Sequence, residues 1–234
     1  MQMDSLPLVL LPGLLCDARL WRDPAVTLAD LAPIHHADLT LDDSVAGMAA
    51  RVLATAPPVF ALAGLSMGGY VAFEILRQAP QRVARLALLD TSARTDPPKR
   101  LAVRKAGLAL AESGRFAGVT RKLLPQLVHE SRVDGAVGEE VMAMAQRVGR
   151  DAFLRQQRAI IDRPDSLPLL PTIAVPTLIG VGEDDRMTLP EEARLLHTTI
   201  PGARLHVFAR CGHLPPMEVP QETAAVLRDW LQAP

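Results

Sequence analysis

The amino-acid sequence predicts an α/β fold with a mostly parallel sheet of about six strands, helices on both faces and a helical insertion. Short apolar runs alternate with helical patterns in both the first and the last part of the chain. Pro97-Pro98 and the segment 164–168 bracket a stretch with helical patterns but no clear strand. A Gly-x-Ser-x-Gly sequence at 64–68 stands between an apolar run and a helical pattern, where a sharp turn is required.

The first part of the chain alternates strand and helix. We expect four strands, at 6–11, 34–39, 59–63 and 83–90. Helical patterns lie between them, at 17–32, 43–56 and 69–78. Pro24 is expected to break the first of these helices. Such alternation gives parallel strands, and ligands bind beyond the carboxyl ends of parallel strands. Gly13-Leu14, Ser66 and Asp90 all fall at these ends.

A helical insertion is predicted over residues 95–167, after the third strand–helix unit. Its helical patterns lie at 97–112, 115–130, 138–149 and 151–162. Four helices are too many for one crossover, so we interpret them as a cap over the strand ends, with ordinary crossover helices as the alternative. The core then comprises 1–94 and 168–234. Its last elements are expected as strands at 174–181 and 203–209 and helices at 190–199 and 220–232.

Composition and charge are those of an ordinary globular chain, with 234 residues, 49% apolar, 22% charged and a net charge of -1. A charge so near zero offers no electrostatic footprint for nucleic acid or an anionic membrane. We therefore expect a small-molecule substrate and no nucleic-acid or membrane partner, with a homodimer left open. Met1–Asp4 hold no basic residue and no apolar run reaches membrane-spanning length, which predicts a cytoplasmic protein without a signal peptide.

Cofactor and metal sites are not expected. The histidines and cysteines form no cluster with metal-ligand spacing. The glycine-rich turn lacks the Gly-Lys-Ser/Thr ending of a phosphate-binding loop. Cys16 and Cys211 are too few for a disulfide framework, so we predict free thiols, and neither stands in a context typical of a nucleophile.

Ser66 is the candidate nucleophile. Gly64 and Gly68 flank it, and a side chain at either position would collide with the neighbouring strand or helix in so tight a turn. Such an elbow lifts the serine hydroxyl above the sheet. The alternative is a glycine-rich turn with an incidental serine.

A serine hydroxyl needs a base beside it, and the base needs an orienting acid. His213 follows the last strand directly, whereas the other histidines lie on strands, in a helix or in the insertion. The loop after the preceding strand offers several acids. Asp185 is the favoured candidate, Asp184 the near alternative and Asp90 a distant one.

An oxyanion hole requires two backbone N–H groups aimed at the developing negative oxygen. One is expected from Met67, the residue after the nucleophile, and the other from the turn after the first strand, at Leu14. A plain Pro-Gly connection is the alternative for that turn.

Four stretches together resemble small bacterial members of the α/β-hydrolase superfamily, of the pimeloyl-ester esterase and enol-lactone hydrolase type. They are 11–17 (LPGLLCD), 64–69 (GLSMGG), 182–186 (GEDDR) and 211–216 (CGHLPP). The resemblance implies a serine hydrolase that cleaves carboxylic esters through an acyl-enzyme. In the acid loop of this family the aspartate falls three positions after a glycine, which assigns the role to Asp185. Carbon–carbon hydrolysis or an elimination reaction by the same triad is the alternative, and a non-catalytic binding module is less favoured.

The chain departs from this family in two places. Many relatives have His-Gly at the oxyanion turn, where this chain has Pro12-Gly13, so support from a histidine side chain is lost. Many also begin with two further strands, and we therefore expect about six strands rather than eight. The aliphatic composition of 95–167 predicts a small or medium acyl group. Arginines there could meet a substrate carboxylate or simply be solvated, namely Arg100, Arg104, Arg121 and Arg155.

Overall fold

The computed structural model describes residues 5–233, and its centre is one six-stranded sheet. Met1–Asp4, part of the basis for expecting no signal peptide, lie outside the described residues. The strand order is β2-β1-β3-β4-β5-β6, and every neighbouring pair is parallel. The strands are β1 (Leu8–Leu11), β2 (Ile34–His36), β3 (Phe60–Leu65), β4 (Val83–Leu89), β5 (Thr177–Gly182) and β6 (Arg204–Phe208). The prediction of a parallel sheet of about six strands is confirmed.

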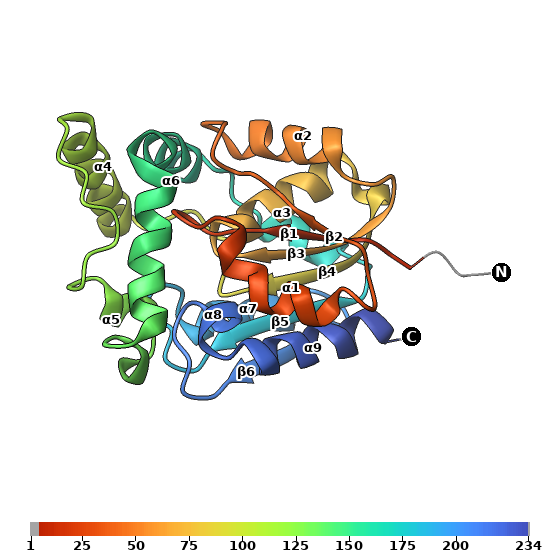
Figure 1. Cartoon of the computed structure of the whole chain (residues 1–234). Coiled ribbons are helices and arrows are strands. Elements are labelled where there is room, and N and C mark those ends of the chain that lie inside the picture. Colours follow the sequence, from red (N-terminus) through yellow and green to blue (C-terminus); the bar gives the residue numbers. More distant parts are fainter. Residues whose placement is uncertain (1–4, 234) are drawn as a thin grey trace.

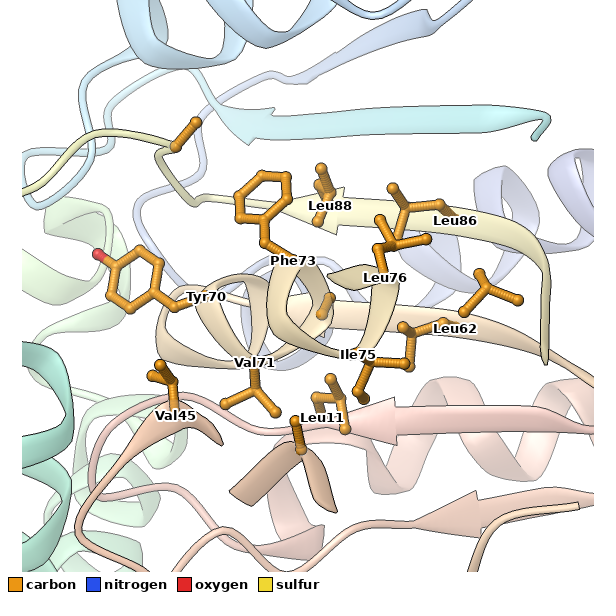
Figure 2. Close-up of a cluster of buried hydrophobic side chains, with 14 of the residues drawn as sticks. Leu11, Val45, Leu62, Tyr70, Val71, Phe73, Ile75, Leu76, Leu86 and Leu88 are labelled. Atoms are coloured by element: carbon orange, nitrogen blue, oxygen red, sulfur yellow. The ribbon is translucent and has the colours of Figure 1, made fainter. Parts of the chain in front are cut away.

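Helices cover both faces of this sheet (Figure 1). One face carries α2 (Val45–Thr55), α3 (Met67–Gln78) and α7 (Pro190–Thr199), and the other carries α1 (Arg22–Leu28) and α9 (Pro220–Gln232). Successive strand residues point to opposite faces, so the four buried residues of β1 divide evenly between two hydrophobic clusters. Figure 2 shows one of these clusters, in which side chains of α3 pack beside those of β4.

Pro24 does not interrupt the first helix as expected. The pattern at 17–32 divides before it, into a 3-10 turn over Ala18–Trp21 and then α1. Pro24 occupies the first turn of α1, where backbone N–H groups have no partner within the helix. Asp17 caps the 3-10 turn, because its carboxylate accepts the N–H of Arg19 at 2.9 Å. Proline therefore marks the start of this helix.

The segment between β4 and β5 contains α4 (Pro98–Glu112), the short α5 (Leu124–Leu127) and the long α6 (Ala136–Ile161). We call this segment the insertion. It lies at the end of the sheet toward which the strands run (Figure 1). No helix among the described residues is both long and apolar enough to cross a membrane.

The helix expected at 115–130 was wrong. Four residues of it form α5, and the rest is irregular chain with one turn, up to the start of a 3-10 turn at Glu130. Gly114 and Gly118 take positive φ angles of 88° and 62°, which end a right-handed helix. The helices expected at 138–149 and 151–162 form the two arms of α6, which meet at a kink where Gly149 has φ 80° and ψ 178°.

Candidate active site

Ser66 stands at the sharp turn between β3 and α3, with φ 55° and ψ -113°. A positive φ in a residue with a side chain costs about 1–3 kcal/mol and persists only where its surroundings hold it. The Ser66 N–H donates to the carbonyl of Leu89 at 3.0 Å, and the Thr91 hydroxyl donates to the Ser66 carbonyl at 2.7 Å. These bonds connect the turn to β4 and the loop after it.

Close packing of the turn requires the flanking glycines. A Cβ at Gly64 would lie 2.5 Å from the carbonyl oxygen of Gly68, and one at Gly68 would collide with the carbonyl of Leu11. A Cβ at Gly69 would collide with the side chain of Thr91, a constraint that the sequence did not reveal. The clashes at Gly64 and Gly68 involve backbone carbonyl oxygens, so no flexible side chain can move aside to relieve them.

His213 and Asp185 lie side by side in the loops after β6 and β5. The Nδ1 atom of His213 is 2.8 Å from Oδ2 of Asp185, and both side chains are buried. The other oxygen of Asp185 accepts the N–H groups of Met187 and Thr188 at 2.7 and 3.0 Å. Asp184 is exposed, and its carboxylate lies 3.8 Å from Nε2 of His129. Of the two acids in this loop, Asp185 is therefore the one beside the imidazole.

Asp90 is a third member of this buried group. A ligand atom of Asp90, one of Asp185 and one of His213 all lie within 4.8 Å of one another. One oxygen of Asp90 accepts the N–H of Gly182 at 2.9 Å, and the other has no partner in the described part of the chain. Burial, followed by the charge of Asp185, raises the pKa of Asp90 well above its ordinary value. The raised pKa shifts Asp90 toward its neutral form.

These three side chains also have the donor types that can bind a metal ion. In the observed geometry, Nδ1 of His213 lies within hydrogen-bond distance of Oδ2 of Asp185, at 2.8 Å. A carboxylate at this distance can orient the imidazole of a candidate base.

Glu218 fixes the histidine loop, and the sequence did not single it out. Its buried carboxylate accepts the N–H groups of Gly212 and Leu214, each at 3.1 Å. It also accepts the N–H of His129, in the insertion, at 2.7 Å. The N–H of His213 itself donates to the carbonyl of Leu127 at 2.9 Å. The candidate base is therefore held from both the core and the insertion.

The two candidate oxyanion donors lie at the turn after β1 and at the start of α3. Met67 is the first residue of α3, so its N–H has no acceptor within the helix. Leu14 lies in the turn, and no acceptor for its N–H is found among the described residues. Both N–H groups are thus free to meet an oxygen atom of a substrate.

Gln156 supports the oxyanion turn in place of the missing histidine. It is fully buried on the second arm of α6, and its Oε1 accepts the N–H of Leu15 at 3.0 Å. Its Nε2 donates to the carbonyl of Leu39 at 3.1 Å. Leu15 has φ 58°, so the bond holds a residue in an unfavourable conformation. The indole N–H of Trp21 donates to the carbonyl of Leu11 at 3.2 Å and anchors the start of the same turn.

A cavity of about 510 Å³ joins these elements. The core contributes Ser66, His213 and the turn at 13–16, and the insertion contributes apolar walls. The aliphatic and aromatic residues of these walls are Val103, Val119, Leu123, Leu127, Val141, Met144, Phe153 and Ile160. Its volume falls in the range of sites for small organic molecules.

The cysteines are buried and unbridged. Burial raises the pKa of the Cys16 thiol to about 12, and burial also raises the pKa of Cys211. Neither thiol is a nucleophile at neutral pH, because the thiolate is the reactive form.

Comparison with known proteins gives the same picture of the fold. The chain matches the model of the "Alpha/beta hydrolase family" over residues 8–226. It is 30% identical to the pimeloyl-[acyl-carrier protein] methyl ester esterase of Neisseria meningitidis serogroup B over 195 residues, 80% of this chain and 72% of the relative. It is 28% identical over 178 residues to a 2-hydroxy-6-oxononadienedioate/2-hydroxy-6-oxononatrienedioate hydrolase of Paraburkholderia phymatum, 73% of this chain and 61% of the relative.

A solved structure is similar over nearly the whole chain. It is a thermophilic esterase from Thermogutta terrifontis with malate bound, with a TM-score of 0.87 and 29% sequence identity. The match covers 97% of this chain and 90% of the esterase.

Proposed function

Because this chain belongs to the alpha/beta hydrolase family and is a hydrolase, we propose that it cleaves small or medium carboxylic esters through an acyl-enzyme on Ser66. The observation that carries this proposal is the buried His213–Asp185 pair, whose histidine lines the same cavity as the strained Ser66. The esterases among its relatives support the choice of substrate class.

The first half of the proposed reaction forms the acyl-enzyme. The Ser66 Oγ attacks the ester carbonyl carbon while Nε2 of His213 takes its proton. Asp185 holds Nδ1–H and stabilises the imidazolium that results. The N–H groups of Leu14 and Met67 donate to the oxyanion of the tetrahedral intermediate. His213 then protonates the alkoxide as the carbon–oxygen bond breaks, and the alcohol leaves.

The second half returns the free enzyme. His213, neutral again, takes a proton from water, and the hydroxide attacks the acyl carbonyl carbon. The same two N–H groups stabilise the second oxyanion. The intermediate collapses, the bond to Ser66 Oγ breaks, and His213 gives the proton back to the serine. The carboxylic acid leaves the site and loses its proton to water.

A chain-length series of p-nitrophenyl esters tests this proposal. The wild type should turn over the short and medium esters, and Ser66→Ala should lower kcat by about a thousandfold or more, since the remaining donors cannot replace a nucleophile. An organophosphate should label Ser66 with a loss of activity that follows the labelling. Retained turnover in Ser66→Ala would contradict the mechanism.

Carbon–carbon bond hydrolysis by the same residues is the second candidate, favoured by the relative from Paraburkholderia phymatum. A wild type that ignores every ester but cleaves a vinylogous diketone in a Ser66-dependent reaction would establish it. Elimination from an enol substrate would be identified by release of a small acid without uptake of water. Absence of both turnover and labelling would favour a non-catalytic binding module.

A further inference from the structure

The fully charged side chains that line the cavity, among the described residues, are all cationic. Among the described residues that line it, Arg100, Arg104 and Arg186 carry full charges, and no aspartate or glutamate faces the same space. The remaining wall is largely apolar. A concave apolar wall strengthens the field of such charges, because little water is present to screen them. The cavity therefore favours an anionic group on its ligand.

The arginines of α4 are on the cavity side by the geometry of the helix. Four residues of α4 line the cavity, at 100, 103, 104 and 107. This spacing of three and four residues places them on one face of a helix. Arg121 is instead exposed and paired with Asp134 at 3.0 Å, and Arg155 donates to the carbonyl of Thr40 at 2.7 Å. Neither of those two lines the cavity.

One carboxylate is shared by three arginines behind this face. Asp96, whose side chain is 3% exposed, contacts Nε of Arg104, Nη2 of Arg163 at 2.9 Å and Nε of Arg100 at 3.5 Å. Burial alone would raise the pKa of Asp96, but the hydrogen bond of Arg163 and the charges of Arg104 and Arg163 together lower it. Asp96 is thus ionised, and a cluster of three cations and one anion remains positive.

Arg163 completes the support of this cluster. Its guanidinium stacks over the ring of Tyr70 at 4.3 Å and donates to the carbonyls of Ile160 and Arg94. With these partners, and with a side chain that is 5% exposed, it is closed to a ligand. Its role is to hold Asp96, which in turn holds Arg104.

Protein contacts hold the Arg104 guanidinium in place but leave some of its N–H donors without a partner. Its Nε contacts Asp96 and its Nη1 donates to Oε1 of Gln157 at 3.3 Å. Its Nη2 has no protein partner in the part of the chain that the structure describes. Because the guanidinium plane is fixed through Nε and Nη1, the N–H groups of Nη2 remain available to a carboxylate oxygen.

We propose that Arg104, assisted by Arg100, binds a free carboxylate of the substrate, so that the preferred esters carry a second, anionic end. This specificity rests on the proposed esterase function. The apolar walls of the same cavity suit an aliphatic spacer between the ester and the carboxylate. Arg163 and Asp96 act as positioning residues for Arg104.

The test compares esters that differ only in the charge of the far end. Monomethyl esters of linear dicarboxylic acids are paired with the corresponding ester-amides, and acetyl esters of hydroxy acids are paired with those of hydroxy amides. The wild type should prefer the carboxylate in one of the two series by about 10- to 100-fold in kcat/KM, as expected for charge-assisted hydrogen bonds. The series that shows the preference identifies the side of the ester that carries the anion.

Arg104→Gln should abolish this preference through a higher KM and leave turnover of the neutral esters within about twofold. Arg104→Lys should restore part of the preference. Arg121→Gln, which removes an exposed arginine of the insertion away from the cavity, is the matched control and should behave as the wild type. If Arg104→Gln fails to fold, Arg100→Gln should show the same selective loss to a smaller extent.

Two outcomes would overturn the carboxylate site. One is equal use of charged and neutral esters by the wild type, and the other is an equal loss for both kinds of ester in Arg104→Gln. Both leave the esterase function intact, because the neutral esters still report Ser66-dependent turnover. Failure of the wild type on every ester would instead contradict the proposed function itself.

Discussion

The sheet core and the insertion are packed in very different ways. Every residue of β1, β3 and β5 is buried, whereas Ala111 is the only buried residue among the fifteen of α4. The core holds the strained turn at Ser66 by hydrogen bonds between neighbouring strands and by glycine contacts that admit no side chain. The α4 helix contributes arginines and an apolar face to the cavity with little burial of its own. The candidate catalytic residues thus lie where packing is dense, and the proposed carboxylate site lies where packing is loose.

Parts of the insertion also hold the loops of the candidate active site, as the sheet core does. Gln156 on α6 holds the oxyanion turn, and the segment around α5 holds the histidine loop through Leu127 and His129. These parts of the insertion act as core, whereas α4 acts as a variable wall. We therefore expect that catalytic positioning and substrate choice can be altered separately, and four predictions test where that separation lies.

The largest effect is expected within the core, from the acid beside His213. Asp185→Asn should lower kcat by about 10³–10⁴-fold, because an amide neither stabilises the imidazolium nor fixes the correct tautomer. Asp184→Asn changes the neighbouring, exposed acid and should stay within about twofold of the wild type. Steady-state kinetics on a p-nitrophenyl ester measure both. Equal losses in the two variants would show that the whole loop, rather than one carboxylate, carries the effect.

The next effect crosses the boundary, from the insertion to the oxyanion turn. Gln156→Ala should lower kcat by about 10- to 100-fold with little change in KM, since a misplaced oxyanion donor weakens the transition state more than substrate binding. Gln146→Ala is the matched control. Gln146 is exposed on the other arm of α6 and donates only to the carbonyl of Ala117 at 3.1 Å. An unchanged kcat in Gln156→Ala would mean that α6 lines the cavity without positioning the oxyanion turn.

The same difference in packing explains which structural features the sequence could predict. The parallel sheet, its strand number and the family are confirmed, because buried strands and the turns between them leave local signals in apolar runs, glycines and prolines. The roles of Ser66, Asp185 and His213 stay predictions until the variants are measured. The segment 115–130 has a helical pattern but does not form the expected helix. Gly114 and Gly118 take positive φ angles, and few residues of the segment are buried.

Contacts between distant segments were beyond sequence-based prediction. The bond from Leu15 to Gln156 spans 141 positions, and nothing in the local pattern of either residue indicates it. Glu218 follows His213 closely, but its burial and its three N–H partners depend on how the loop folds against the insertion. Such polar contacts are set by tertiary packing, which a single sequence does not display.

A smaller effect is expected from two glycines within the insertion. Gly149→Ala places a side chain at φ 80°, ψ 178°, a region open almost only to glycine, and should destabilise the protein by about 1–3 kcal/mol. Apart from the neighbouring residues and the helix's own backbone, no atom lies within 4 Å of the added Cβ, so we attribute the expected loss to backbone strain. Gly107→Ala, inside α4 and equally free of clashes, should stabilise by about 0.5–1 kcal/mol. Thermal melts measure both changes in stability. If the two variants changed stability in the same direction, the expected strain from a side chain at position 149 would be contradicted.

The smallest effect is expected from Asp90, and it depends on pH. Folding raises the pKa of this carboxyl above its unfolded value, so the folded state binds its proton more tightly than the unfolded state does. Asp90 therefore costs no stability below the unfolded pKa, and the cost grows as pH rises from there toward the folded pKa.

Asp90→Asn keeps the oxygen that accepts the N–H of Gly182 and cannot ionise. The variant should match the wild type in Tm at acidic pH and exceed it at neutral pH by about 2–4 °C, the shift that about 1 kcal/mol gives in a domain of this size. Ester turnover at neutral pH should stay within several-fold of the wild type, because Asp90 favours the neutral form that asparagine imitates. A loss of activity as large as that of Asp185→Asn would instead mean that the two carboxyls share the charge beside His213, and that the imidazole is oriented by a pair rather than by Asp185 alone.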